Sequence, residues 1–233
     1  MNVPVTRFDA GPKRPADPAA ALVEAVAQAR RSGGGRLELW IEHVDDTLDA
    51  VATDAGFEQW RDLFQMRCPL PVPGERTNDF TVRSFTPADA DDFLRVNNRA
   101  FSWHPEQGNM TLEGLRQRIA QPWFDAGGFL LHERDGRLAG FCWTKVHPAD
   151  PVLGDPAMGE IYTIAIDPDF HGRGLGGPMT LAGLDWLAQQ GLEVGMLYVE
   201  SDNQPAVRTY ERLGFTVHHI DRAYVLTVPA PTA

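Results

Sequence analysis

The chain has 233 residues, enough for one or two domains, and 43% of them are hydrophobic, as in an ordinary globular protein. Its 32 acidic and 21 basic residues give a formal charge of −11, which argues against nucleic acid as the main partner because no basic stripe would neutralise phosphates. The two cysteines are far apart, the seven histidines lack metal-ligand spacing, and no apolar run approaches the roughly 18 residues of a membrane span, so the sequence predicts no disulfide framework, metal site or membrane anchor.

The first 75 residues are expected to hold only part of a domain. Residues 1–17 lack periodicity and are interpreted as an irregular arm, and residues 74–79 as a linker. Pro18 favours the first turn of a helix, and Gly56 is suited to the end of another. The expected elements are helices over 18–31 and 45–55 and strands over 37–41 and 57–70.

A second series of elements begins at Phe80 and continues almost to the end of the chain. Asp135-Gly136 is a strong signal for the turn of a β-hairpin, and the proline-rich residues 147–157 predict a loop. The expected elements are strands over 81–85, 129–133, 138–145, 160–166 and 195–200, helices over 87–101, 111–120, 177–190 and 204–213, and one or two last strands up to residue 228.

An internal repeat bears on the domain organisation. Residues 37–57 and 195–215 align without a gap, and Gly56-Phe57 matches Gly214-Phe215. On this interpretation residues 18–73 are the second half of a domain whose complete copy is 76–228. The alternative is two unrelated strand–helix units that end in a common glycine–aromatic stop. We expect a partial, non-catalytic copy over residues 1–75 and a catalytic domain over 76–233.

Residues 158–177 have the pattern of an anion site. A run of β-branched and aromatic residues ends at Asp167-Pro168, where proline removes a ladder donor. Glycines follow at 172, 174, 176 and 177, and then comes an apolar pattern with helical spacing. A strand, a glycine loop and a helix N-terminus present free amides and a favourable dipole to a negatively charged ligand.

The same stretch resembles motif A of the GNAT superfamily of N-acetyltransferases. The resemblance lies in the strand over 164–166 and in His171-Gly172-Arg173-Gly174-Leu175-Gly176, where histidine replaces the usual glutamine or arginine. Residues 198–215, with Asn203, Tyr210 and Gly214-Phe215, resemble motif B. The resemblance implies a mixed α/β (α+β) sheet, here a GNAT fold preceded by a partial second GNAT-like repeat.

A narrower resemblance is to the mycothiol synthases, a GNAT family with tandem domains. It rests on residues 97–108, 141–148, 159–162 and 197–203. Two features depart from the family: the N-terminal copy lacks a first half with a glycine loop, and residues 149–158 are longer than the usual connection. The family resemblance implies acetyl-CoA as co-substrate, no metal, and acetylation of the cysteinyl amine of cysteinyl-glucosaminyl-inositol to form mycothiol.

The cofactor residues follow from the two motifs. Main-chain amides of the loop would bind the diphosphate, the strand edge would pair with pantetheine, and a backbone N–H near Ile164 would stabilise the oxyanion. Asn203 could cap its helix or bond pantetheine. The complete set is Ile164, Ala165, Ile166, His171, Gly172, Arg173, Gly174, Leu175, Gly176, Gly177, Asn203, Gln204, Pro205, Ala206, Val207 and Arg208.

Two residues are candidates for proton transfer. Glu160 precedes Ile164 by four residues, so regular alternation would place both on one face, with Glu160 as a base acting through water. Tyr210 lies two helical turns after Asn203 and is the candidate general acid for the leaving thiolate. The alternatives are a solvated strand-end glutamate and a core tyrosine. The equivalent positions of the N-terminal copy, Asp45 and Ala52, cannot perform this chemistry.

Substrate contacts are implied by the family resemblance. Glu106, Lys145, Glu160 and Tyr198 match the positions at which the family holds its sugar–inositol substrate. The tryptophans Trp103, Trp123 and Trp143 are interpreted as core residues rather than cleft residues. His171 and the pair His218-His219 are interpreted as structural.

Three functional hypotheses follow, with a cytoplasmic location expected for each because residues 1–17 lack the basic and apolar regions of a signal peptide. The first is the mycothiol synthase reaction; the second is a GNAT enzyme for another small amine; the third is a non-catalytic acyl-CoA-binding module. The expected partner is a small thiol-containing amine, with neither nucleic acid nor membrane. The chain is expected to be a monomer, or a dimer formed through the N-terminal half-domain.

Overall fold

The computed structural model describes residues 5–11, 14–73, 80–103 and 108–230. In these residues a single mixed sheet has nine strands in the order β1-β2-β9-β3-β8-β7-β6-β5-β4. The pairs β1–β2 and β7–β8 are parallel, and the other neighbours are antiparallel. The strands are β1 (Val5–Phe8), β2 (Gly35–Ile41), β3 (Glu58–Pro69), β4 (Arg83–Ser84), β5 (Phe129–Arg134), β6 (Arg137–His147), β7 (Met158–Ile166), β8 (Val194–Glu200) and β9 (Thr216–Val228).

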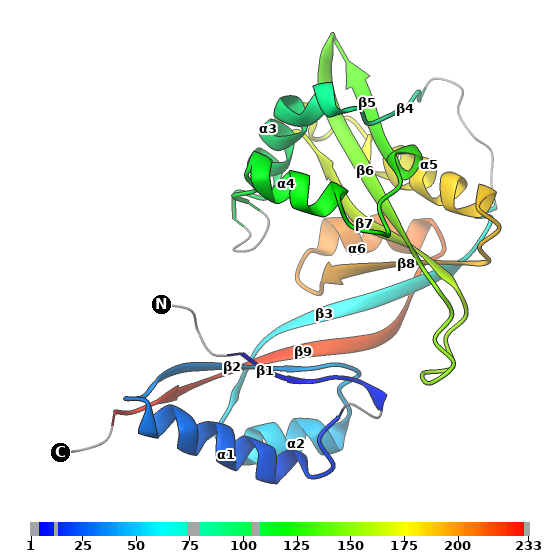
Figure 1. Cartoon of the computed structure of the whole chain (residues 1–233). Helices are drawn as coiled ribbons and strands as arrows, with labels where there is room; N and C mark the ends of the chain where they lie inside the picture. Colours follow the sequence, from blue (N-terminus) through cyan, green and yellow to red (C-terminus); the bar gives the residue numbers. More distant parts are fainter. Residues whose placement is uncertain (1–4, 12–13, 74–79, 104–107, 231–233) are drawn as a thin grey trace.

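The helices cover different parts of this sheet (Figure 1). The helices α1 and α2 pack with β1, β2 and β9 around one core. The helices α3 and α4 pack on β5–β7 around a second core, and α5 and α6 pack around a third. None of the described helices is long and apolar enough to cross a membrane. The α-helices are α1 (Pro18–Arg31), α2 (Asp46–Asp54), α3 (Ala90–Ala100), α4 (Leu112–Ile119), α5 (Gly176–Gln189) and α6 (Gln204–Arg212), and the 3-10 turns are η2 (Pro87–Asp89), η3 (Ala126–Gly128) and η4 (Pro168–Phe170).

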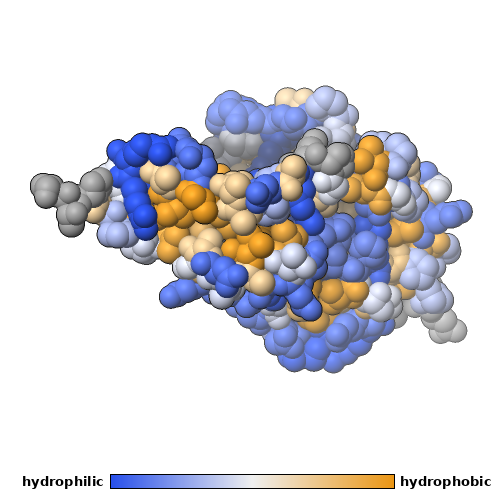
Figure 2. Space-filling model, turned by 90° about the horizontal axis from the view of Figure 1, so that it is seen from below, coloured by the Kyte–Doolittle hydropathy of each residue, from blue (hydrophilic) through white to orange (hydrophobic). Residues whose placement is uncertain are grey.

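Side-chain caps start several of these helices. The carboxylate of Asp17 accepts a hydrogen bond from the Ala20 amide at the start of α1, and Asp45 does the same for Leu48 in α2. The outer surface of this pair is mixed: patches of apolar side chains lie beside hydrophilic ones on the underside of the molecule (Figure 2), and Val23 of α1 is 68% exposed. The burial that stabilises α1 and α2 therefore comes from their inner faces, against the sheet.

Close packing fixes α5 on the sheet. Gly183 faces β6 and β7 so closely that an added Cβ would lie 2.5 Å from the Cys142 sulfur and 2.8 Å from Ile161. Gly159 on β7 lies equally close to Leu187 of α5. These two glycines let the helix approach the strand, and they place the N-terminus of α5 beside the end of β7.

The structure confirms the internal repeat. The helices α1 and α5 have equal lengths and start 158 residues apart, and so do α2 and α6. The strand pairs match as well: Leu39 lies opposite Tyr224, and the equivalent pair is Met66 and Leu197. Leu63 and Asp221, themselves equivalent, lie opposite each other, which gives β3 and β9 an approximate two-fold relation.

The two copies exchange their last strands. β9, from the C-terminal copy, lies between β2 and β3, whereas β3, from the N-terminal copy, lies between β9 and β8. Figure 1 shows β3 and β9 crossing the middle of the molecule, between the lower part with α1 and α2 and the upper part with α3–α6. The copies therefore share one sheet.

Several expected elements differ from the structure. Residues 1–17 are not all irregular, because Val5–Phe8 forms β1 and the buried Phe8 belongs to the core under α1. The repeat therefore begins one strand before residue 18. At the other edge, the strand expected over 81–85 is only Arg83–Ser84, and Pro87 starts a 3-10 turn before α3.

The end of the chain, expected as one or two strands, is one 13-residue strand. Two register shifts between β3 and β9 bend this long pair without breaking it. The linker expected over 74–79 lies outside the described residues.

Candidate active site

A cleft of about 740 Å³ opens where β7, the glycine loop and α6 meet. It brings together most of the expected cofactor residues and Tyr210. The expected residues that line it are Ile164, Ala165, Ile166, His171, Gly172, Gly174, Leu175, Gly176, Asn203, Pro205, Ala206 and Tyr210. It is also lined by residues outside the expected cofactor set: Ala100, Phe101, Trp103, Phe170, Thr180, Asp202 and Thr209.

The glycine loop follows from local conformations. Asp167 accepts a hydrogen bond from the Asp169 amide and turns the chain at the end of β7. Gly172 and Gly174 have φ of 74° and 72°, a region in which side chains other than glycine are strained. The helix α5 then begins at Gly176, and no side chain caps it at Leu175. Its first amides are therefore available to an anion.

The strands β7 and β8 diverge beside this loop. They pair at Gly159 and Glu160, but β7 continues to Ile166 along β6. This divergence leaves the end of β7 at the cleft, where Ile164–Ile166 form one wall. His171 closes the loop onto this strand, since its Nε2 donates to the Ile166 carbonyl at 2.9 Å.

Tyr210 lies on α6 at the opposite wall of the cleft and is 9% exposed. Burial raises the pKa of its hydroxyl, so the phenol remains protonated at neutral pH. Asn203 caps the same helix, with its side-chain oxygen 3.4 Å from the Ala206 amide. A protonated hydroxyl and a helix N-terminus thus face the glycine loop across the cleft.

Glu160 and Ile164 do not share a face, contrary to the expectation. A bulge in β7 places Trp143 opposite Thr163 and Thr144 opposite Ile161, so one residue of β7 is unopposed. Beyond the bulge, Glu160 lies opposite Lys145, whereas Ile164 packs on the core under α5. The extra residue reverses the alternation, because each one-residue shift moves side chains to the other face.

His147, which sequence reasoning missed, contacts Glu160. The distance between His147 Nε2 and Glu160 Oε2 is 2.7 Å, and the Glu160 side chain is only 10% exposed. Lys145 lies opposite Glu160, but its ammonium is over the rings of Trp123 and Tyr162, at 5.2 Å and 5.7 Å from their centroids. His147 lies two residues after Lys145 on the same strand, so both side chains are on one face, and this spacing could have indicated His147.

Tyr198 lies outside the cleft lining. It is on β8, two residues from Met196, which lies opposite Glu160, so Tyr198 and Glu160 share a face of the sheet. Its hydroxyl accepts a hydrogen bond from Gln65 Nε2 at 2.9 Å. Burial raises the pKa of this hydroxyl to about 12, and the neighbouring carboxylates of Asp221 and Glu160 act in the same direction. The position expected at Glu106 lies outside the described residues.

The remaining expected cofactor residues do not line the cleft with their side chains. Val207 is buried in the core, Gln204 bonds the Ser201 carbonyl, and the Arg173 guanidinium lies over the Phe170 ring. The others in this group are Gly177 and Arg208. Any contribution from this group to a ligand would therefore come mainly from the backbone.

The three tryptophans have different environments. Trp143 is fully buried in the core under α3 and α4, and Trp123 packs against it, as expected for core residues. Trp103 is not a core residue: it is 62% exposed and lines the cleft. The spacing of Trp103 after α3 could not distinguish these two environments.

The histidines near the centre of the sheet form a cluster. The rings of His43 and His219 have centroids 3.5 Å apart and are tilted by 32°, and the Nδ1 atoms of His218 and His219 are 2.9 Å apart. Burial lowers the pKa of His219 to about 3, so it is neutral at pH 7. Among the described residues, no group of three or more histidine, cysteine, aspartate or glutamate side chains is arranged to hold a metal ion.

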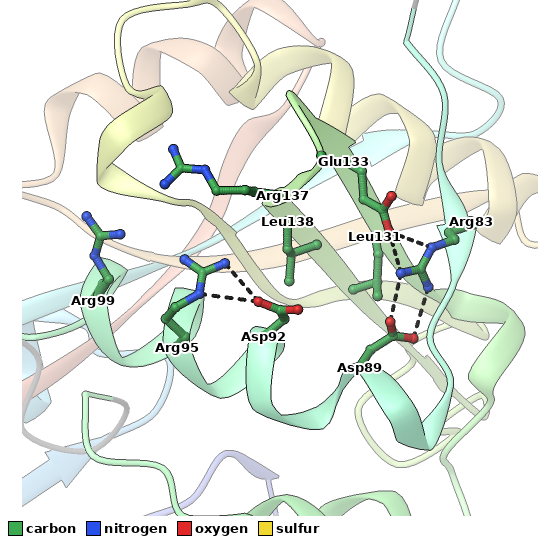
Figure 3. A pocket seen from close by; sticks show the side chains of 10 residues that line it. Arg83, Asp89, Asp92, Arg95, Arg99, Leu131, Glu133, Arg137 and Leu138 are labelled. Atoms are coloured by element: carbon green, nitrogen blue, oxygen red, sulfur yellow. Dashed lines mark hydrogen bonds and ion pairs between the residues drawn. The ribbon is translucent and has the colours of Figure 1, made fainter.

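A second hollow, of about 390 Å³, lies between α3 and the β5–β6 hairpin. Figure 3 shows Arg83 between Asp89 and Glu133, and Arg95 against Asp92. Arg83 holds the pKa of Asp89 down to about 2. Arg99 and Arg137 bond Asp169, at the start of the glycine loop. Ion pairing within the protein accounts for these arginines, and Arg95, Arg99 and Arg137 pair with Asp167 or Asp169 beside the loop.

Comparison with known proteins gives consistent matches. The family model described as Acetyltransferase (GNAT) family matches residues 91–215. A mycothiol acetyltransferase of Thermomonospora curvata is 47% identical over 209 residues, which cover 88% of this chain and 67% of that protein. Another, of Mycobacteroides abscessus, is 48% identical over 204 residues, 85% of this chain and 67% of that protein. A third, of Segniliparus rotundus, is 42% identical over 234 residues, which cover 92% of this chain and 87% of that protein.

Solved structures show the same fold. A GCN5-related N-acetyltransferase of Sphaerobacter thermophilus has a TM-score of 0.68 at 19% identity, covering 91% of this chain and 66% of that chain. A tandem GNAT protein of the clavulanic acid biosynthesis pathway has the same TM-score at 16% identity, covering 100% and 77%. The tandem protein is consistent with the two-copy arrangement seen here.

Proposed function

The chain belongs to the mycothiol acetyltransferases of the GNAT family, and on that premise we propose that it transfers the acetyl group of acetyl-CoA to the cysteinyl amine of cysteinyl-glucosaminyl-inositol, forming mycothiol. One observation carries the proposal. A glycine loop at a helix N-terminus, a diverging strand and a buried protonated tyrosine meet in one cleft. These are the groups that acyl transfer from a thioester of CoA requires.

Acetyl-CoA fits this cleft by its chemistry. The amides between His171 and Gly177 lead into α5 and suit a diphosphate, because the helix dipole adds to their hydrogen bonds. The end of β7 has free backbone groups beyond Glu160 that suit the amides of pantetheine. A backbone N–H near Ile164 would stabilise the oxyanion; loss of one such donor commonly costs about 100-fold in rate.

Glu160 is the proposed base. The substrate ammonium must lose a proton before its nitrogen can attack the thioester carbon, and the proton would pass through water to the carboxylate. Two neighbours support this role: His147 Nε2 contacts the Oε2 atom of Glu160, and Lys145 lies opposite Glu160 on the neighbouring strand. On this proposal the substrate amine would lie on the face of the sheet that carries Glu160, opposite to the face of Ile164.

Tyr210 is the proposed acid. When the tetrahedral intermediate collapses, the carbon–sulfur bond breaks and the thiolate of CoA takes the phenolic proton. Because burial raises the pKa of Tyr210, the proton is present at neutral pH. Glu106, Lys145, Glu160 and Tyr198 are the proposed contacts to the hydroxyl-rich substrate.

Further parts of the proposal concern the whole chain. We propose that residues 1–75 form a non-catalytic partial copy and residues 76–233 the catalytic domain, although the two exchange strands. A cytoplasmic location and either a monomer or a dimer through the N-terminal copy complete the proposal. Val5 is apolar and 49% exposed on the edge strand β1, and an exposed edge strand can pair with a second chain. Light scattering would test whether such a dimer forms.

The testing experiment follows acetylation by mass spectrometry of the product. Purified protein is incubated with acetyl-CoA and either cysteinyl-glucosaminyl-inositol or other small amines. Acetylation of the first amine is the expected result. Acetylation of other amines only would favour a different GNAT substrate, and binding of acetyl-CoA without turnover of any amine would favour a non-catalytic module.

A further inference from the structure

The strand β3 brings residues of the N-terminal copy to the sheet face that carries Tyr198 and Glu160, two of the proposed substrate contacts. It lies next to β8, with Gln65 opposite Tyr198 and Arg67 opposite Met196. Residues directly opposite on antiparallel strands share a face, so Gln65 faces the same side as Tyr198 and Glu160. Gln65 is only 4% exposed, and a buried amide needs a hydrogen-bond partner for each end.

The orientation of the Gln65 amide is determined by Arg67. Arg67 Nε lies 2.7 Å from Gln65 Oε1, and its two terminal nitrogens contact Asp155 at 2.6 Å and 3.1 Å. A guanidinium can only donate hydrogen bonds, so the Gln65 oxygen must accept and its NH₂ group must point the other way. That group lies 2.9 Å from the Tyr198 hydroxyl oxygen.

The direction of this chain of hydrogen bonds has a consequence for Tyr198. Because Gln65 donates, the Tyr198 oxygen accepts, and the phenolic hydrogen is not used in this contact. Burial raises the pKa of Tyr198 to about 12, so that hydrogen is retained at neutral pH. Tyr198 is 40% exposed, so part of this side chain is open to a ligand.

We propose that Gln65 is a positioning residue which makes Tyr198 a hydrogen-bond donor to an oxygen of the amine substrate, a sugar or inositol hydroxyl or an amide carbonyl. The N-terminal copy thus takes part in substrate recognition through its exchanged strand, with Arg67 and Asp155 holding the amide in place. This inference rests on the proposed function and specifies the role of Tyr198 within it.

Gln65→Glu tests the direction of the hydrogen bond. A carboxylate has no N–H, can still pair with Arg67, and would accept the phenolic hydrogen of Tyr198, which withdraws it from the substrate. We expect KM for the amine to rise about 10-fold, close to the effect of Tyr198→Phe, with KM for acetyl-CoA unchanged. Gln59→Glu, on an exposed position of the same strand, is the matched control and should match the wild type.

The double variant Gln65→Glu, Tyr198→Phe makes the test specific. If Gln65 acts through Tyr198, the double variant should resemble Tyr198→Phe within about 2-fold, because the interaction is already lost. Effects that multiply would overturn the inference, and so would a Gln65→Glu enzyme with the wild-type KM. If Gln65→Glu does not fold, Gln65→Met removes the donor without adding charge and should raise KM less.

If the wild-type enzyme acetylates only other amines, the proposed substrate is wrong. The same variants would then be compared on the amine that the enzyme accepts. A wild type without turnover would reject the proposed function. The inference would then be decided by ultraviolet titration of Tyr198, taken as the difference from Tyr198→Phe. In the Gln65→Glu variant the new carboxylate accepts the phenolic hydrogen, so Tyr198 should ionise at higher pH than in the wild type, and an unchanged titration overturns the inference.

Discussion

The same series of strand, helix, strand, helix and strand occurs twice in this chain, and within the described residues the first two strands stay paired in the first copy but diverge in the second. In the first copy β1 and β2 pair continuously, from Val5 opposite Glu38 to Phe8 opposite Ile41. In the second copy the pairing of β7 with β8 ends at Glu160. Where the two strands remain paired, the backbone groups between them bond each other and are not open to a ligand.

The helix that follows shows the same contrast. In the first copy Asp17 caps α1 and places its own carboxylate at the helix N-terminus. In the second copy the equivalent position is Leu175, and no side chain caps α5. Further along, Ala52 is buried where Tyr210 faces the cleft. The proposed anion site at the N-terminus of α5 and the capped N-terminus of α1 therefore differ by a few side chains at equivalent positions.

The largest expected effect comes from removing the hydroxyl that distinguishes the second copy. Tyr210→Phe should lower kcat about 1,000-fold, because the leaving thiolate loses its proton donor. The control is Tyr224→Phe, which removes a hydroxyl that donates to Asp49 in the first copy's core. It should reduce stability by about 1 kcal/mol and leave kcat unchanged. Steady-state kinetics that place Tyr210→Phe within about 3-fold of wild type would contradict the acid role.

Glu160 tests the proposed base, which lies on the face of the sheet opposite to Ile164. Glu160→Gln should lower kcat about 100-fold at pH 7, and its rate should recover as pH rises because the free amine becomes abundant without a base. His147→Ala should lower kcat about 10-fold, since it removes only the contact that orients the carboxylate. Val146→Ala, next to it on the exposed strand end, is the control. A pH–rate profile of Glu160→Gln parallel to that of the wild type would exclude the base role.

The junction between the copies offers a stability test. Burial raises the pKa of Asp221 to about 6, above its ordinary 3.8, so the folded state holds this proton more tightly than the unfolded state. The contribution of Asp221 to the free energy of unfolding should therefore fall as pH rises from about 4 to 6, and it should stay at this lower value at higher pH. Asp221→Asn cannot ionise and can still accept from the His43 amide, so it should be more stable at pH 8 by about 1–2 kcal/mol.

Denaturant unfolding at pH 5 and pH 8 measures this difference. The gain should be smaller at pH 5, where Asp221 is mostly protonated in the folded protein. Leu63, the repeat equivalent of Asp221, lies opposite it and carries no charge. The N-terminal copy therefore has no ionisable group at this position to add to the pH dependence of stability. An equal gain at both pH values would show that ionisation is not its cause.

The smallest effect compares two helix caps at equivalent positions. Asp45→Ala and Asn203→Ala should each reduce stability by about 1 kcal/mol, because each removes the side-chain acceptor of a first-turn amide. Only Asn203→Ala should also raise KM for acetyl-CoA, by about 3-fold, since only Asn203 lines the cleft. Thermal unfolding and steady-state kinetics on both variants check this, and an equal change in KM would remove the contrast between the copies.

Much of the site was accessible to prediction because it is local. The turn at Asp167-Pro168, the left-handed glycines at 172 and 174 and the cap at Asn203 depend on conformations that neighbouring residues determine. The repeat was visible for the same reason, since both copies keep the residues that start and end their helices. The edge strand β1 was missed because four residues with a single buried side chain carry almost no periodic signal.

The sequence alone determined the glycine loop, the repeat and the family, because those depend on residue types at short spacing. Only the tertiary structure decided that β3 and β9 are exchanged, that Gln65 bonds Tyr198 across 133 positions, and that Glu160 shares a face with Lys145 rather than with Ile164. The physical reason is that strand pairing is chosen by packing between distant segments, and a single bulged residue reverses the alternation of side chains that a sequence pattern assumes.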